Sequence, residues 1–232
     1  IMERLVGSEM CIRDRSKGNY THFMEKEIYE QPDALGNTIN GRLGEHDVLD
    51  NIFGLGSSDA FKNVKRIQFV ACGTSLHAAK TARKWFEDIC EIPCYIDFAS
   101  EYRYRNPIVE DHTLFVTISQ SGETADTLAA LEYARAEKYV GIVTICNVPT
   151  STMARNADWK IFTNAGPEIG VASTKAFTTQ LAALLMLALS IAKSQDKNAK
   201  KRKQATQELR ETPALVDQAF SLKENISQIT QN

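Results

Sequence analysis

The chain has 232 residues, of which 43% are hydrophobic and 24% are charged, and its formal net charge at pH 7 is -2. These values are typical of a globular protein with one substantial core, and they give no electrostatic reason to expect DNA, RNA or an acidic membrane surface as a partner. The cysteines, Cys11, Cys72, Cys90, Cys94 and Cys146, lack zinc-binding spacing, and we interpret them as reduced thiols of a cytoplasmic protein.

The first part of the chain differs in pattern from the remainder. Residues 1–15 lack the continuous apolar core of a signal peptide and fit the rest of the sequence poorly, so we expect residues 1–20 to be a non-native or disordered segment. Residues 21–39 have the composition of a helix interrupted at Pro32, whereas residues 41–60 carry four glycines and predict a loop. We interpret these two segments as a helix followed by an interdomain linker.

From Val64 onward, apolar runs alternate with segments of helical spacing. The runs FVA, LFVTI and GIVTIC have no alternating polar positions, which indicates strands covered on both faces, as in a parallel sheet between helices. The sequence therefore predicts an α/β fold built on a five-stranded parallel sheet with helices on both faces. The strands are expected at residues 66–71, 93–98, 113–118, 140–146 and 159–164, and the helices between them at residues 75–89, 123–138 and 151–157.

The C-terminal part of the chain contains an apolar segment and then a charged one. Residues 176–194 are apolar, but their uninterrupted part, 181–192, is too short to cross a bilayer of about 30 Å, so we expect a helix buried in the core and no membrane partner. The cluster KNAKKRK at 197–203 is interpreted as a solvated turn rather than a nucleic-acid patch, because the overall charge is nearly balanced. Residues 204–230 predict a helix with a break at Pro213.

Similar polar turns come after two of the predicted strands. Cys72, Gly73, Thr74 and Ser75 come directly after the first strand, and SQSGET at 119–124 comes directly after the third. Each turn combines a glycine with small hydroxyl residues and precedes a helix, whose free amides and dipole favour an anion. A hydroxyl before a helix can be a simple N-cap, but capping needs only one. Two such turns on neighbouring strands predict a site for a phosphate dianion at the carboxyl edge of the sheet.

A third polar segment, residues 166–180, precedes the apolar helix. Its glycines and proline predict a loop, and Ser173 is the expected N-cap of the helix. The same loop could equally fold over a bound sugar and offer backbone groups of Val171 and Ala172 to its hydroxyls. The sequence leaves both interpretations open.

Motifs for several other kinds of chemistry are absent. The sequence contains neither the P-loop pattern GxxxxGK[ST] nor the dinucleotide-binding pattern GxGxxG, and SQSGE at 119–123 does not form the nucleophile motif GxSxG. The four histidines do not fall at metal-ligand spacings. We therefore expect no nucleotide cofactor and no metal.

Several segments together resemble one enzyme family. They are similar to the first sugar isomerase (SIS) subdomain of the isomerising glutamine–fructose-6-phosphate aminotransferases, also called glucosamine-6-phosphate synthases. The similarity runs from His22 to Pro213, and its last segment is the most specific to this family. The segments are EIYEQP at 27–32, ACGTS at 71–75, ASEYRYR at 99–105, SQSGETADT at 119–127, ICNVP at 145–149 and EIGVASTKAFTTQ at 168–180.

The resemblance implies a flavodoxin-like SIS fold with helical N- and C-terminal extensions. It also implies a cytoplasmic homodimer without a cofactor that forms glucosamine 6-phosphate from fructose 6-phosphate and glutamine, in the pathway to UDP-N-acetylglucosamine. The implied phosphate-binding residues are Thr74, Ser75, Ser119, Gln120, Ser121 and Thr124. The residues implied to contact the sugar or to shape the loops are Cys72, Gly73, Val171, Ala172 and Ser173.

No catalytic residue is assigned. In the family, ammonia is released in a glutaminase domain, and the glutamate base and the Schiff-base lysine belong to a second SIS subdomain. Glu123 is better explained by a helix N-terminus, Glu168 lies on the third polar segment with no obvious basic partner, and Lys175 lies at the opening of the long apolar helix, so we assign a catalytic role to none of them. We expect a sugar-phosphate-binding fragment that is inactive, or nearly so, alone. The expected division is residues 1–20, the helix and linker 21–60, the SIS domain 61–196, and a helical segment 197–232 that leads to the second SIS domain.

Two other functions are weighed against this one. A sugar-phosphate sensor in a transcription regulator would need a helix-turn-helix, and residues 1–50 show no basic recognition helix. A stand-alone isomerase of another phosphosugar is disfavoured by AFTTQ at 176–180 and YEQP at 29–32, which resemble the aminotransferase family more closely.

Overall fold

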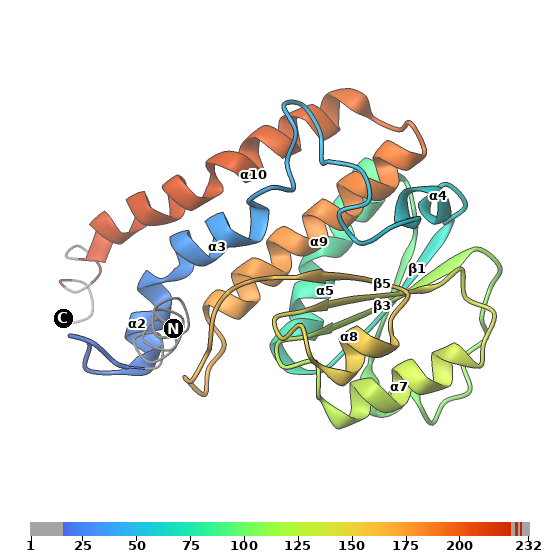
Figure 1. Ribbon diagram of the computed structural model, residues 1–232, viewed down its shortest axis with the longest axis horizontal. Coiled ribbons are helices and arrows are strands. Elements are labelled where there is room, and N and C mark those ends of the chain that lie inside the picture. The colour runs from blue at the N-terminus through green and yellow to red at the C-terminus, as the bar shows by residue number, and fades with distance from the viewer. Residues whose placement is uncertain (1–15, 224–225, 227, 229–232) are drawn as a thin grey trace, which may run out of the picture.

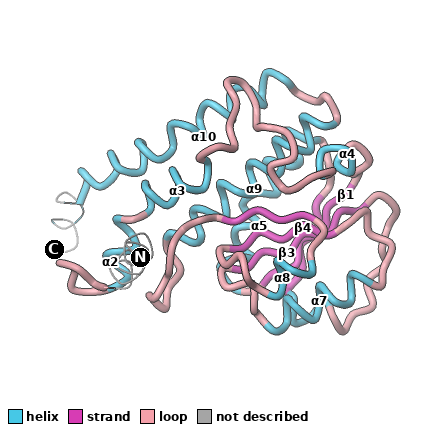
Figure 2. Tube along the Cα trace, in the orientation of Figure 1, coloured by secondary structure: helices cyan, strands magenta, loops and turns pink. Residues whose placement is uncertain are grey.

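The computed structural model describes residues 16–223, 226 and 228, and at its centre lies a five-stranded parallel sheet (Figure 1, Figure 2). The expectation for residues 1–15 lies outside these residues. Along the sheet the strands are in the order β2-β1-β3-β4-β5, and every neighbouring pair is parallel. The bounds are β1 Arg66–Ala71, β2 Cys94–Phe98, β3 Thr113–Ser119, β4 Ile142–Cys146 and β5 Trp159–Phe162.

This strand order confirms the predicted flavodoxin-like fold. β1 lies between β2 and β3, so the order along the chain reverses between β1 and β3. These two strands stay in register from Arg66 opposite Thr113 to Ala71 opposite Ile118. The residues directly after them therefore emerge side by side at the carboxyl edge, where open α/β sheets bind their ligands.

Helices cover both faces of the sheet, as predicted. One face carries α5, the π-helical turn η1 that continues it, and α9, whereas the other carries α6, α7 and α8. Successive side chains of a strand serve the two layers in turn: Phe69 belongs to the core under α9 and Val70 to the core under α7. The bounds are α5 Gly73–Trp85, η1 Phe86–Cys90, α6 Ala99–Tyr102, α7 Ala125–Arg135, α8 Thr152–Asn156 and α9 Lys175–Ser194.

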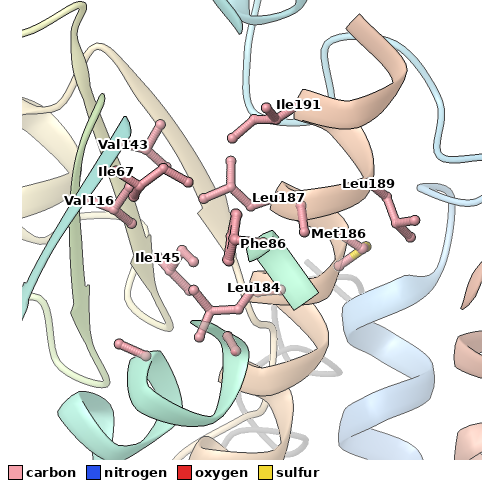
Figure 3. Packing of buried hydrophobic residues seen from close by; sticks show 14 of the residues in the cluster. Ile67, Phe86, Val116, Val143, Ile145, Leu184, Met186, Leu187, Leu189 and Ile191 are labelled. Carbon is pink, nitrogen blue, oxygen red and sulfur yellow. The ribbon is translucent and has the colours of Figure 1, made fainter. Parts of the chain in front are cut away.

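The apolar helix α9 runs through the middle of the protein. In Figure 3, Leu184 and Leu187 point toward the strand residues Ile145 and Val116, while Leu189 points the other way, toward α3 (Gln31–Ile39). By length and composition α9 could cross a membrane, but 78% of its most apolar window is buried inside the protein. The prediction of a core helix is confirmed, and contact on two sides explains why the helix has no continuous polar face.

An outer layer of helices covers α9. Figure 1 shows α3 (Gln31–Ile39) and α10 (Ala199–Ala219) on the side of α9 away from the sheet, with α2 (Phe23–Tyr29) next to α3. The helix predicted over residues 21–39 is interrupted, but at Glu30, which separates α2 from α3, rather than at Pro32. Pro32 lies in the first turn of α3, where its missing amide removes no helical hydrogen bond.

Two expectations for the C-terminal segment are wrong. Residues 199–203 of the basic cluster form the first turns of α10 rather than a solvated turn. Arg202 is 7% exposed, and its Nε donates to Asp47 Oδ2 at 2.8 Å, so this charge serves a contact within the protein. Pro213 does not break the helix, which continues to Ala219 because packing against α3 and α9 offsets the backbone hydrogen bond that a proline removes.

The glycine-rich segment 41–60 consists mostly of turns, as predicted, but it is part of the core. It contains the short helix α4 (Ser57–Phe61) and a bridge between Leu43 and Val48. Phe53 and Phe61 are fully buried and contact each other edge to face. This segment therefore packs against the sheet domain.

Candidate functional site

The first candidate loop consists of Cys72, directly after β1, and the first residues of α5, Gly73, Thr74 and Ser75. Gly73 has a φ of +56°, a left-handed conformation that glycine adopts most easily. Thr74 is exposed, and its hydroxyl has no hydrogen-bond partner within the described part of the chain. Ser75 is 8% exposed and accepts a hydrogen bond from Gln180 Nε2 of α9 at 3.0 Å. The two predicted phosphate ligands of this loop therefore differ. Thr74 faces solvent, whereas the Ser75 hydroxyl is hydrogen-bonded to Gln180 of α9.

The second candidate loop joins β3 to α7, and its hydroxyls bond largely within the loop. Ser119 Oγ accepts from the Gly122 amide and shares a hydrogen bond with Thr124 Oγ1, both at 3.0 Å. Ser121 Oγ accepts from the Glu123 amide at 3.2 Å. These bonds shape the turn, and the Thr124 side chain does not cap α7.

Gly122 and Glu123 pack the second loop against α8. Gly122 has a φ of +67°, and a Cβ atom added to it would lie 2.3 Å from Ser151 Oγ. Glu123 Oε1 accepts from the Thr152 amide at 2.6 Å, in the first turn of α8. Glu123 thus serves a helix N-terminus, as expected, but that of α8 rather than of the helix it precedes.

The two loops are neighbours. They begin after Ala71 and Ile118, which are paired across the sheet, and Thr127 Oγ1 at the start of α7 donates to Cys72 Sγ of the first loop at 4.0 Å. α5 and α7 follow neighbouring parallel strands, so their positive N-terminal ends lie at the same edge, and no side chain of the described residues caps either helix. An anion placed at this edge would meet two helix N-termini and neutral hydroxyl donors.

The third loop is held by a carboxylate rather than by the predicted cap. α9 begins at Lys175, and Ser173 does not cap it. Glu168 Oε1 accepts from the amides of Thr174 and Ala176 at 2.8 and 3.2 Å, and Glu168 Oε2 accepts from Ser173 Oγ at 3.3 Å. A carboxylate is favoured over a hydroxyl here because it accepts several hydrogen bonds and carries charge at the positive end of a long helix. The expectation that Ser173 is the N-cap is therefore wrong.

The exposed part of the third loop lies between Glu168 and α9. Val171 is fully exposed, and Ala172 is exposed as well. Asn147, directly after β4, ties the start of the loop down: its Oδ1 accepts from the Ala165 amide at 2.8 Å, and its Nδ2 donates to the Gly166 carbonyl at 2.7 Å. The Asn147 amide also donates to the Gln120 carbonyl at 3.1 Å, which links the second and third loops.

Residues that sequence reasoning missed connect the loops to the scaffold. They are Glu27, Asn147 and Gln180, and each lies within a family-like segment, EIYEQP, ICNVP or AFTTQ. Membership of such a segment was the only sequence signal for these residues, because nothing local indicates which distant partner a side chain meets. Gln180 Oε1 is buried beside Ser75 and has no hydrogen-bond partner among the residues that the structure describes.

The charged groups near the loops are already engaged with the protein. Lys175 is 3% exposed, and its Nζ lies 2.6 Å from Glu30 Oε2. Glu123 and Glu168 accept backbone amides, as described above. Burial raises the pKa of the Cys146 thiol below the second loop, which keeps it protonated. None of these groups is placed as a free base or nucleophile.

Known proteins resemble this chain along most of its length. The SIS domain family matches residues 60–190. A glutamine–fructose-6-phosphate aminotransferase (isomerizing) of Idiomarina loihiensis is 47% identical over all 232 residues of this chain, which span 38% of that relative. The corresponding protein of Pseudomonas aeruginosa is 49% identical over 216 residues, covering 93% of this chain and 35% of the relative. The chain thus spans well under half of these relatives' length.

A solved structure agrees with these relatives. The C-terminal domain of a glucosamine-fructose-6-phosphate aminotransferase from Francisella tularensis superposes with a TM-score of 0.88 at 47% identity. The match covers 92% of this chain and 60% of that domain. The chain is similar to one part of such a domain, in sequence and in fold.

Proposed function

The chain belongs to the SIS domain family, and from this we propose that it is the sugar-phosphate-binding part of an isomerising glutamine–fructose-6-phosphate aminotransferase. The complete enzyme forms glucosamine 6-phosphate and glutamate from fructose 6-phosphate and glutamine. We place it in the cytoplasm as a homodimer, in the route to UDP-N-acetylglucosamine. The chain binds neither nucleic acid nor a membrane in this proposal.

The observation that carries the proposal is the pair of uncapped helix N-termini at the point where the strand order reverses. α5 and α7 begin beside each other. The residues that lead into them and the first turn of α5 carry hydroxyls and the Gln120 amide but no cation, and the one acid in the first turn of α7, Asp126, pairs with Arg103 at 3.5 Å. A phosphate dianion between them accepts hydrogen bonds from free backbone amides and is stabilised by both helix dipoles. In this proposal the phosphate ligands are Thr74, Ser75, Ser119, Gln120, Ser121 and Thr124.

Within this set the roles divide by what each side chain already contacts. Thr74 and Gln120, whose side chains have no partner among the described residues, reach toward the phosphate. Ser119 hydrogen-bonds to Thr124 and holds the turn, so that the remaining hydroxyl proton of the pair points to the ligand. Cys72 and Gly73 shape the first loop, and Val171, Ala172 and Ser173 meet the sugar.

The chain's part in the reaction is binding and orientation. Isomerisation needs a base within hydrogen-bond reach of the sugar carbons, and amination needs a free amine or a similar carbonyl trap. Glu123, Glu168 and Lys175 are engaged elsewhere and take neither role in this proposal. The reacting groups belong to another part of the enzyme, and this chain alone is inactive or nearly so.

Calorimetric titration of fructose 6-phosphate into the chain and its Thr74→Val variant tests the proposal. Because Thr74 donates to a dianion and has no structural partner, we expect the variant to bind about ten- to a hundredfold more weakly while remaining as stable as the wild type. Thr81→Val is the matched control, since Thr81 is exposed on the same helix and bonds only to the His77 carbonyl. Equal affinity of the Thr74 variant would refute the phosphate assignment, and absence of binding by the wild type would refute the proposed function.

A further inference from the structure

A buried glutamate of the outer helical layer reaches the third loop. Glu27 lies on α2 and is 2% exposed. Its Oε1 accepts from the Ile169 amide at 2.5 Å and from the Gly170 amide at 3.0 Å, and its Oε2 lies 3.2 Å from the same Gly170 amide. A side chain that is 142 positions away along the chain from Ile169 thus holds two successive amides of this loop.

The contact between Glu27 and the third loop depends on the identity of both Gly170 and Glu27. A Cβ atom on Gly170 would lie 2.5 Å from Glu27 Oε2, so only glycine lets the loop backbone approach the carboxylate this closely. Among the described residues Glu27 forms no ion pair, whereas Glu30 on the same side of α9 pairs with Lys175. A buried carboxylate without a cation is costly unless its hydrogen bonds are made, and here the loop amides make them.

Glu27 and Glu168 hold the two ends of the exposed part of the third loop. Residues 169–170 are held by Glu27, and the next anchor is Glu168, whose carboxylate holds Ser173 and the start of α9. Between the two anchors lies a short exposed span, Val171 and Ala172, whose apolar side chains cannot form hydrogen bonds that would fix it. The place of this span is therefore set from two sides, by α9 and by α2.

We propose that Glu27 is a positioning residue for the sugar: by holding the amides of Ile169 and Gly170, it fixes the span 171–173 against the sugar portion of the ligand. The inference rests on the proposed function, since it assumes a sugar phosphate at the carboxyl edge. In the proposed function the phosphate group is bound by the first and second loops, whereas the hydrogen bonds of the Glu27 carboxylate among the described residues go to the third loop. Loss of Glu27 therefore weakens recognition of the sugar and leaves recognition of the phosphate intact.

The test compares fructose 6-phosphate with inorganic phosphate as ligands of wild-type chain and of Glu27→Ala. We expect the variant to bind fructose 6-phosphate at least about tenfold more weakly, while its affinity for inorganic phosphate stays within about twofold. Glu27→Gln keeps one acceptor oxygen, so its affinity for fructose 6-phosphate lies between the two. Amide hydrogen exchange at Ile169 and Gly170 should be faster in Glu27→Ala, with or without ligand.

The control is Glu25→Ala, the same substitution on the same helix at a residue whose side chain is 38% exposed and pairs with Lys223 at the protein surface. It should change neither affinity. If Glu27→Ala fails to fold, Glu27→Gln decides the question by the same comparison of ligands. Unchanged affinity for fructose 6-phosphate, or equal weakening for both ligands, overturns the role of Glu27 alone. If the wild type binds inorganic phosphate but not fructose 6-phosphate, the proposed function fails instead.

Discussion

Residues of one chemical type do different work in the three loops. Thr74 presents its hydroxyl to solvent, Ser75 accepts from α9, and Ser119 holds the turn of the second loop. Among the acids, Glu123 and Glu168 each hold the start of a helix. The role of each side chain depends on the partner it meets. Residue type alone is therefore a poor guide to whether a side chain contacts a ligand or stabilises the loop.

At the residue scale, we predict that Gly122→Ala destabilises the protein by about 2–4 kcal/mol. The substitution forces a Cβ into a left-handed conformation and against Ser151, where it would lie 2.3 Å from Oγ. Urea denaturation measures the change in free energy of unfolding. Gly36→Ala is the control, because Gly36 lies inside α3 with no atom within 4 Å of an added Cβ, and there alanine should stabilise by up to about 1 kcal/mol. Equal effects at the two glycines would contradict this account of the second loop.

Among the elements, α9 has the largest structural role. It packs on the sheet and on α5 with one side and on α3 and α10 with the other, and its N-terminal end carries the third loop. Gln180 of α9 also holds Ser75 of the first loop. One helix therefore joins the core, the outer layer and two of the three loops.

At the scale of elements, we predict that Leu187→Ala in α9 lowers the free energy of unfolding by about 2–5 kcal/mol. Leu187 is fully buried between the helix and the sheet, and the substitution leaves a cavity that the rigid surroundings cannot fill (Figure 3). Leu215→Ala in α10 is the matched control, since that side chain is 56% exposed and should change stability by no more than about 0.5 kcal/mol. Denaturant titration of both variants provides the comparison, and similar losses would argue against α9 as the core helix.

At the scale of the whole molecule, the outer helices have no core of their own. α3 and α10 bury their apolar side chains against α9, and α2 reaches the third loop through Glu27. The linker 41–60 contributes Phe53 to the core. Phe53 and the adjoining Phe61 belong to the same hydrophobic cluster as residues of the sheet. The described part of the chain is therefore built around shared buried surface rather than around separate modules.

This arrangement predicts cooperative unfolding. Tryptophan fluorescence reports on Trp85 and Trp159, which both pack against the larger core cluster, whereas far-ultraviolet circular dichroism reports on all the helices. Because the outer helices depend on α9, the two signals should give the same urea midpoint. A loss of helical signal before the fluorescence change would mean that the outer layer unfolds independently.

Much of the fold was predictable from short stretches of sequence. Apolar runs without alternation identified the parallel strands, and each such run is a local property of a few residues. The polar turns after β1 and β3 were recognisable for the same reason, because glycine and hydroxyl residues stand next to each other in the chain. That these two turns are neighbours was also predictable, since parallel strands end at a common edge.

Only the tertiary structure decided which distant groups each polar side chain meets. Glu27, Glu168 and Arg202 find their partners through the packing of helices and loops, and the same packing keeps α10 intact across Pro213. Local sequence encodes conformational preference and burial, whereas a hydrogen bond between residues far apart depends on how the whole chain is folded. For this reason the sequence indicated where the loops lie, and the three-dimensional structure determined what holds them there.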